Sequence, residues 1–96
     1  MRGHTRESVI EKYLTAQIEA AGGFTRKLKW IGRNGAPDRL VLLPGGWLAF
    51  VELKAPGKKP EPHQARELAR LEVMGQRVHV IDSLLAVDML IQEWGP

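Results

Sequence analysis

The sequence contains no cysteine, which excludes disulfide bonds and thiolate metal sites and is compatible with a reducing compartment. It also lacks a long apolar run. The longest stretch without a charge, 40–51, is interrupted by a Pro-Gly-Gly sequence and is too short to cross a bilayer. The first residues, MRGHTRES, do not contain the apolar segment of a signal peptide. We therefore expect a cytoplasmic protein with no membrane partner.

Positively charged residues are only slightly in excess over negatively charged ones. Fourteen Lys and Arg residues against eleven Asp and Glu residues give a net charge of +3, which permits a polyanionic partner such as nucleic acid but does not require one. With 96 residues, of which 44% are hydrophobic, the chain can form one core. We expect a single domain that spans residues 1–96.

Hydrophobic spacing and turn residues predict seven elements in the order αβββαβα. A first helix begins near Thr5 and stops at Gly22, and the last is capped by Asp82 or Ser83. The other elements are expected at residues 24–30, on both sides of the turn 44–46, and at 61–74, 78–81 and 84–94. This order predicts an α/β fold in which helices flank a central mixed sheet.

The segment PDRLVLLPGGWLAFVELKAPGKK, residues 37–59, is typical of a hairpin with charged groups at its open end. If residues 44–46 form a three-residue turn, Asp38 lies opposite Glu52, and Lys54 points to the same face. A two-residue turn would instead place the two acids on opposite faces. Both faces of the strands are otherwise apolar, so we expect a hairpin buried on both sides, with the acids at its rim.

Two carboxylates that face each other repel unless a cation or a proton lies between them. Asp38 and Glu52 would suit Mg²⁺, which prefers oxygen ligands and keeps several waters. The ammonium of Lys54 could position a water and offset charge in the transition state of phosphodiester hydrolysis. The alternative is that Lys54 forms an ordinary salt bridge at a strand end, because a Glu-x-Lys sequence is common by chance.

GAPDRLVL followed by FVELKAPGKK resembles the PD-(D/E)xK nucleases, and specifically the small VRR-NUC branch found in phages and bacteria. The resemblance covers nearly the whole chain, from RESVIEKYL in the first helix to GQRVHVID in the last strand. It implies a restriction-endonuclease-like core and a metal-dependent DNA endonuclease. If the chain is encoded by a phage, the expected location is the cytoplasm of the host cell.

The resemblance also implies roles for individual residues. Asp38 and Glu52 would bind Mg²⁺ or Mn²⁺, with the backbone carbonyl of Leu53 as a third ligand. Lys54 would be the catalytic lysine, and Gln64 would orient either this lysine or the substrate.

An acid in the first helix completes the catalytic set of this family. It corresponds best to Glu7, with Glu11 as the alternative one turn later. Both could instead be first-turn acids favoured by the helix dipole.

Basic residues in the N-terminal region and in two loops flank the proposed site, where they could contact DNA phosphates. They are Arg6, Lys27, Lys29, Arg33, Lys58 and Lys59. For any one of them, solvated surface charge is the alternative. Arg39 should point to the opposite face from Asp38 and brace the sheet or a helix.

The family resemblance further implies a homodimer that acts on four-way (Holliday) junctions, because symmetric cleavage of a branched DNA needs two sites related by a two-fold axis. One alternative is a nuclease with the same chemistry that cuts flap, linear or single-stranded DNA. Another is a DNA-binding module without catalysis.

Overall fold

The computed structural model describes residues 6–95, and the seven elements follow the predicted order αβββαβα. They are α1 (Glu7–Ala20), β1 (Phe24–Lys27), β2 (Arg39–Leu43), β3 (Trp47–Leu53), α2 (Pro62–Val73), β4 (Arg77–Ile81) and α3 (Leu84–Trp94). Thr5, the predicted start of the first helix, lies outside the described residues. In this part of the chain, no helix is long and apolar enough to cross a membrane.

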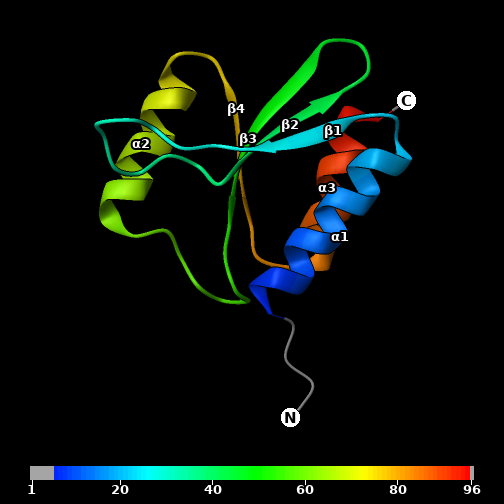
Figure 1. The fold of residues 1–96 in the computed structure, drawn as a ribbon, viewed down its shortest axis with the longest axis horizontal. Helices are drawn as coiled ribbons and strands as arrows, with labels where there is room; N and C mark the ends of the chain where they lie inside the picture. Colours follow the sequence, from blue (N-terminus) through cyan, green and yellow to red (C-terminus); the bar gives the residue numbers. More distant parts are fainter. Residues whose placement is uncertain (1–5, 96) are drawn as a thin grey trace.

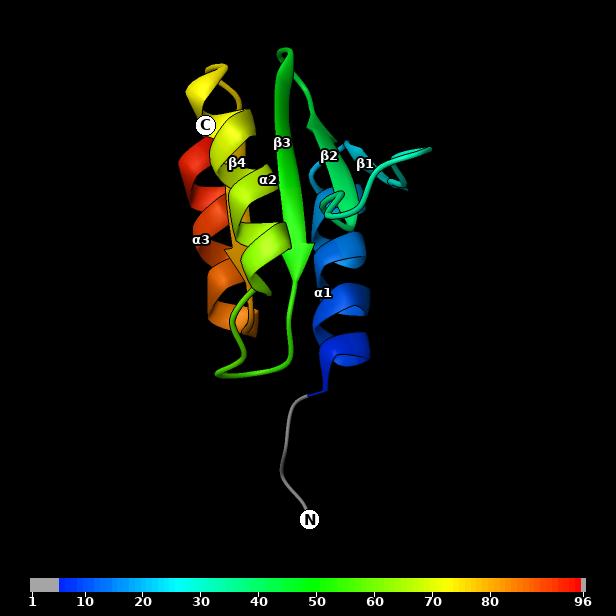
Figure 2. The ribbon, with the colours of Figure 1, turned by 90° about the vertical axis from the view of Figure 1, so that its left-hand side faces the viewer.

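The strands form one four-stranded sheet in the order β1-β2-β3-β4. The first three are antiparallel neighbours, and β4 pairs with β3 in parallel after the chain crosses over through α2. Figure 1 shows α1 and α3 on one side of the sheet and α2 on the other, and Figure 2 shows the same layers from the side of α2. The predicted mixed sheet flanked by helices is confirmed.

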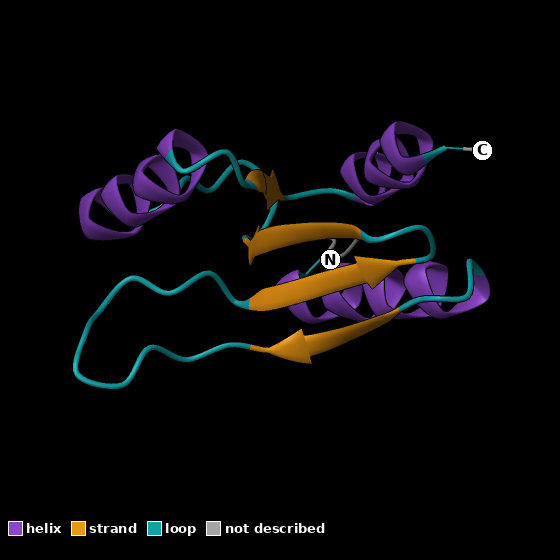
Figure 3. Cartoon of the chain, turned by 90° about the horizontal axis from the view of Figure 1, so that it is seen from above, coloured by secondary structure: helices purple, strands orange, loops and turns teal. Residues whose placement is uncertain are grey.

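The β2–β3 hairpin has the register expected for a three-residue turn. Leu43 pairs with Trp47, and Arg39 pairs with Val51 at the other end. Figure 3 shows neighbouring strands of the sheet running in opposite directions, with a short turn that joins two of them. Continuing this pairing by one residue brings Asp38 opposite Glu52. The turn needs its glycines, because Gly45 and Gly46 have φ angles of +89° and +78°, which residues with a side chain rarely adopt.

One face of the hairpin forms the core with α1 and α3. Every second residue of β2 and β3 is buried there against Ile10, Leu14 and Ile18 of α1 and Val87 and Leu90 of α3. Full burial of a side chain of this kind stabilises the fold by about 1.5–3 kcal/mol. The strand residues of this face are Val41, Leu43, Trp47, Ala49, Val51 and Leu53.

The other face of the hairpin is covered only in part, so the expectation of full burial on both faces was wrong. Leu40, Leu42, Leu48 and Phe50 keep part of their surface exposed. The reason is that α2 is short and packs mainly over β4. The apolar residues of the strands could not show how much of this face the helix covers.

Element ends differ from the prediction in one informative place. The strand expected at 24–30 ends at Lys27, after which the Leu28 amide donates to the Asp38 carbonyl at 3.0 Å. Residues 28–37 then leave the sheet as a loop on the same side as α2 (Figure 1). As one of the two predicted caps, Ser83 starts α3 by accepting a 3.0 Å hydrogen bond from the Ala86 amide.

Candidate active site

Asp38 lies just before β2, opposite the end of β3. Its Oδ2 accepts a hydrogen bond of 2.7 Å from the backbone amide of Leu53. This bond crosses the open end of the hairpin and fixes the orientation of the carboxylate. Pro37, which is fully buried, holds the chain just before Asp38. The first acid of the predicted pair is therefore attached directly to the strand that carries the second.

Glu52 is almost completely buried, with 1% of its surface exposed. Its Oε2 lies 3.3 Å from the Lys54 Nζ, whereas its Oε1 is buried and has no hydrogen-bond partner within residues 6–95. Burial raises the pKa of Glu52, and the negative charge of Asp38 raises it further, against the opposing effect of Lys54. The two carboxylates thus act on each other as the hairpin register predicts.

Lys54 is held between two acceptors. Its Nζ lies 3.3 Å from the Glu52 Oε2 and donates to the Gln64 Oε1 at 2.8 Å. Gln64 is near the start of α2, where its Oε1 also accepts from the Glu61 amide at 2.8 Å. The start of α2 therefore holds the side-chain amide of Gln64 in place, and this amide in turn orients Lys54. One of the predicted roles of Gln64, contact with Lys54, corresponds to this geometry.

The donors at this end of the hairpin fit a hard divalent cation. An unpartnered, buried carboxylate oxygen next to a second carboxylate is a position where positive charge would be stabilising. Within residues 6–95, no three acidic or histidine side chains gather as a metal-binding group. This is compatible with Mg²⁺, which is commonly held by one or two carboxylates and completes its shell with waters and substrate phosphate.

The two candidate acids of the first helix do not join this pair as a group of three. Glu7 is exposed in the first turn of α1. Glu11 forms an ion pair of 2.8 Å with the Nε of Arg39, whose Nη1 donates to the Thr25 hydroxyl at 2.7 Å. Arg39 thus connects α1 with β1 and β2, as predicted, and Glu11 is engaged on the core side of the sheet.

All six basic residues predicted to contact DNA are exposed. Lys27, Lys29 and Arg33 belong to the segment that ends at Asp38, and Lys58 and Lys59 to the loop that follows Lys54. Arg6 precedes α1, which begins at the same end of the molecule as the 54–61 loop (Figures 1 and 2). The two loops leave the sheet next to Asp38 and Lys54, so in the sequence these cations flank the acid pair on both sides.

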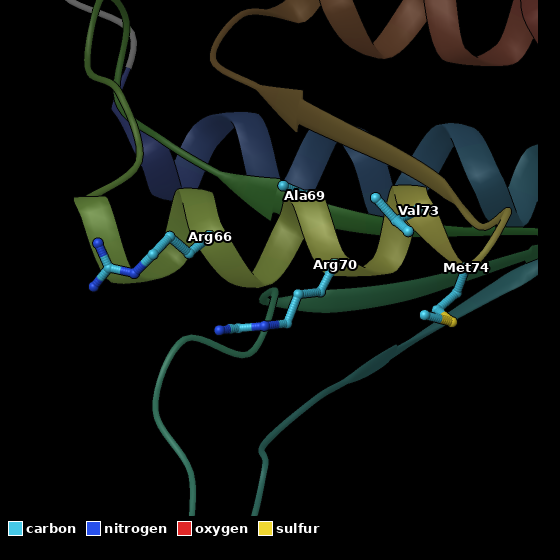
Figure 4. Close-up of a pocket in the computed structure, with 5 residues that line it drawn as sticks. All are labelled: Arg66, Ala69, Arg70, Val73 and Met74. Atoms are coloured by element: carbon cyan, nitrogen blue, oxygen red, sulfur yellow. The ribbon is translucent and has the colours of Figure 1, made fainter.

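A hollow of about 510 Å³ lies elsewhere, along one flank of α2. It is lined by Arg66, Ala69, Arg70, Val73 and Met74, all on or at the end of this helix (Figure 4). It contains neither an acid nor Lys54. None of the candidate catalytic residues at the open end of the hairpin therefore lines this hollow.

One cluster near the site was not anticipated from the sequence. Glu67 of α2 is buried and binds Trp30 and Arg33 of the 28–37 loop. Trp30 had been expected in a strand, and Arg33 either on DNA or as solvated surface charge. Only one local feature of the sequence could have indicated that Glu67 is buried. Glu67 directly precedes Leu68, which is buried, so this turn of α2 faces the protein interior.

Comparison with known proteins finds chains that are similar to this one. "Putative nuclease p44" of Acyrthosiphon pisum secondary endosymbiont phage 1 is 53% identical over 78 residues, which are 81% of this chain and 84% of that protein. A solved structure described as a VRR_NUC domain is 46% identical, with a TM-score of 0.86, and the match covers 94% of this chain and 98% of the other. No protein-family model matches the sequence. At these identities and coverages, the chain belongs to the VRR-NUC family.

Proposed function

We propose that this protein is a metal-dependent endonuclease that hydrolyses phosphodiester bonds in DNA. The observation that carries the proposal is the buried Glu52 oxygen without a partner, next to Asp38 and a lysine held in place. The names of the phage protein and of the VRR_NUC structure described above support the same interpretation. Mg²⁺ or Mn²⁺ is the proposed cofactor, and residues 1–96 are proposed to act as one nuclease domain in the cytoplasm.

Asp38, Glu52 and the Leu53 carbonyl are the groups proposed to hold the cation. When bound, a divalent cation would stabilise the charge that develops on the phosphate. Glu7 is the proposed acid of the first helix, with Glu11 the weaker candidate because it is paired with Arg39.

Lys54 is the proposed catalytic lysine. An ammonium group has three N–H donors, of which two are directed at Gln64 and Glu52. The third remains to bind a phosphate oxygen or to orient the attacking water. Gln64 is proposed as the residue that positions Lys54 for this contact.

Branched DNA is the proposed substrate, cut by a homodimer at four-way junctions. Two active sites related by a two-fold axis could cut opposing strands symmetrically. The fold offers a surface for a second copy, because β4 is an edge strand and Val80, Leu85 and Met89 are exposed on β4 and α3. The six exposed cations are proposed to bind phosphates, which would position DNA without selecting a sequence.

The test is cleavage of labelled four-way junction, flap, linear duplex and single-stranded DNA in Mg²⁺ and in Mn²⁺. Lys54→Ala is expected to lower the cleavage rate by about 10²–10³-fold, the cost of removing a preorganised charge from a transition state. The matched control is Lys12→Ala, which removes an exposed lysine from α1 on the other side of the sheet. It should cut at the wild-type rate.

The substrate set separates the alternatives. Paired cuts on opposed strands of the junction, together with a dimer mass in sedimentation, would support junction resolution. Preferred cutting of flap, linear or single-stranded DNA would retain the nuclease and reject the resolvase. Metal-dependent cutting of no substrate, with DNA binding retained, would leave only a binding module.

A further inference from the structure

The loop 28–37 is attached to α2 through one buried carboxylate. Glu67 is 8% exposed, and its Oε2 accepts from the Trp30 indole at 2.6 Å. Its Oε1 accepts from Arg33 Nε at 3.1 Å and lies 3.2 Å from Arg70. Burial would raise the pKa of Glu67, but the Trp30 hydrogen bond and the two arginines outweigh it and lower this pKa. The carboxylate therefore stays charged and holds two loop residues.

A second contact fixes the returning half of the loop. Gly35 has a φ of +94°, and a Cβ placed there would lie 3.0 Å from the His63 carbonyl oxygen and 3.3 Å from the Glu67 Cβ. Only glycine fits both the backbone conformation and the close approach to α2. The loop is thus held against the helix on both sides of its tip, which is the turn Ile31–Gly32.

Ile31 projects from this tip into solvent. It is 97% exposed, the highest value among the large hydrophobic residues of the described chain. A single exposed apolar residue is common and needs no explanation by itself. Here, however, the neighbours Trp30 and Arg33 are both directed to Glu67, so the same anchor that orders the loop turns Ile31 outward.

The tip lies close to the proposed active site along the chain. The loop begins and ends beside Asp38, because the Leu28 amide bonds to the Asp38 carbonyl. Asp38 follows Ile31 by seven positions in the sequence, which limits the distance between them to about 25 Å, or roughly seven base-pair steps of DNA. Lys27 and Lys29 are exposed in the same segment and supply charge that complements a phosphate backbone.

We propose that Ile31 is an apolar wedge that inserts between bases of the DNA substrate near the cleaved bond, while Lys29 binds a flanking phosphate. Proteins that unstack DNA do so with side chains of this type, and an already open branch point lowers the cost of insertion. Glu67 acts as a positioning residue that holds the loop for insertion. The inference rests on the proposed function in taking DNA as the substrate, and it adds a contact to the bases.

The experiment uses full-length protein in a Lys54→Ala background, so that bound DNA is cut much more slowly than the fluorescence is read. Four-way junction and linear duplex carry 2-aminopurine at successive positions within about seven base pairs of the branch or of the duplex centre. DNA binding and 2-aminopurine fluorescence are measured for the parent protein, which carries Ile31, and for the variants Ile31→Ser and Ile31→Leu. The matched control is Val73→Ala, which shortens an equally simple apolar residue that is 80% exposed at the far end of α2.

With Ile31, fluorescence at one or two positions should rise on binding, because the base is unstacked. Ile31→Ser should abolish the rise at saturating protein and weaken binding about ten-fold, the effect of losing one buried apolar side chain. Ile31→Leu and Val73→Ala should retain both signals. Thermal unfolding of Ile31→Ser should match the parent, because an exposed side chain contributes little to stability.

An undiminished fluorescence rise in Ile31→Ser would overturn the proposal, as would the absence of a rise at every position. It would also be overturned if the substitution changed the mass in sedimentation without DNA, since Ile31 would then contact protein. Cleavage by the wild type is scored separately. If the wild type cuts no DNA but unstacking depends on Ile31, the wedge is supported and the endonuclease function is rejected. If DNA is cut but unstacking does not depend on Ile31, the endonuclease function is supported and the wedge is rejected.

Discussion

Two buried glutamates, Glu52 at the rim of the hairpin and Glu67 on α2, have opposite surroundings. Glu67 receives hydrogen bonds or charge from Trp30, Arg33 and Arg70, and these lower its pKa in spite of burial. Glu52 has a lysine at one oxygen and no partner at the other within the described residues. Burial and the charge of Asp38 raise its pKa.

The contrast is between a carboxylate that fastens a loop and one that we propose as a ligand of a cation. A buried charge with all of its hydrogen bonds made can fasten a loop, and removing it leaves donors unsatisfied. A buried charge with an open oxygen is unfavourable for the empty protein and becomes favourable only with a cation or a proton beside it. The two glutamates should therefore respond in opposite ways to the same substitution.

The largest expected effect is on cleavage by Glu52→Gln. The substitution keeps the shape of the side chain and removes a proposed ligand charge, so the rate should fall by about 10³-fold or more. The melting temperature of the metal-free protein should stay equal or rise, because a neutral amide costs less to bury than a carboxylate. Cleavage assays and thermal unfolding without divalent ions check the two parts.

Asp38→Asn serves as the comparison for Glu52→Gln, since both remove one proposed ligand charge. In the parent, Mn²⁺ should raise the melting temperature by mass action, and both variants should lose most of that shift. A Glu52→Gln protein that still cut DNA at the wild-type rate would remove Glu52 from the site.

The next effect concerns Gln64, which ties Lys54 to the start of α2. Gln64→Ala should lower the maximal cleavage rate by about ten-fold and change substrate affinity little, because Lys54 remains but is less well oriented. Single-turnover rates at several DNA concentrations separate the two quantities. Glu61→Ala is the control, since it alters the same helix start without touching Lys54. Equal losses in both variants would point to fraying of the helix.

Part of this contrast could be predicted from the sequence. The Pro-Gly-Gly turn left two registers open, and the structure has the one expected for a three-residue turn, which brings Asp38 opposite Glu52. The prediction for Lys54 followed from the alternation of side chains along a strand, which has a period of two. Within the described chain, β2, β3 and α3 needed little more than hydrophobic spacing and one capping serine.

The Glu67 cluster could not be predicted, because its partners are distant in sequence. Trp30 and Arg33 lie 37 and 34 residues away, and no local pattern relates them to α2. From the sequence alone, Glu67 could equally have been an exposed helix residue paired with Arg70 one turn later. The partial exposure of the second face of the hairpin was missed for a similar reason, since the composition of a strand does not reveal where a helix packs.

A smaller effect, on stability, is expected for Glu67→Gln. An amide cannot accept from Trp30 and also pair with the charges of Arg33 and Arg70, so the melting temperature should fall by several degrees. Cleavage by the acid pair should persist, with weaker DNA binding because the loop is no longer held. Thermal unfolding and binding titrations measure these changes. Glu72→Gln, an exposed position on the same helix, is the control, and an equal fall there would show a general effect of charge on α2.

The smallest effect is the pH dependence of the difference between wild type and Glu67→Gln. The native pKa of Glu67 lies below its ordinary value of 4.5, so the charged group stabilises the fold above that pH, and the stabilisation is lost as the pH falls through the lowered pKa. The gap in melting temperature should be full at pH 7 and should close below about pH 4.5. Because the remaining carboxylates titrate in both proteins, the difference isolates Glu67. A gap that stayed constant down to pH 3 would mean that the shape of the side chain, and not its charge, fastens the loop to α2.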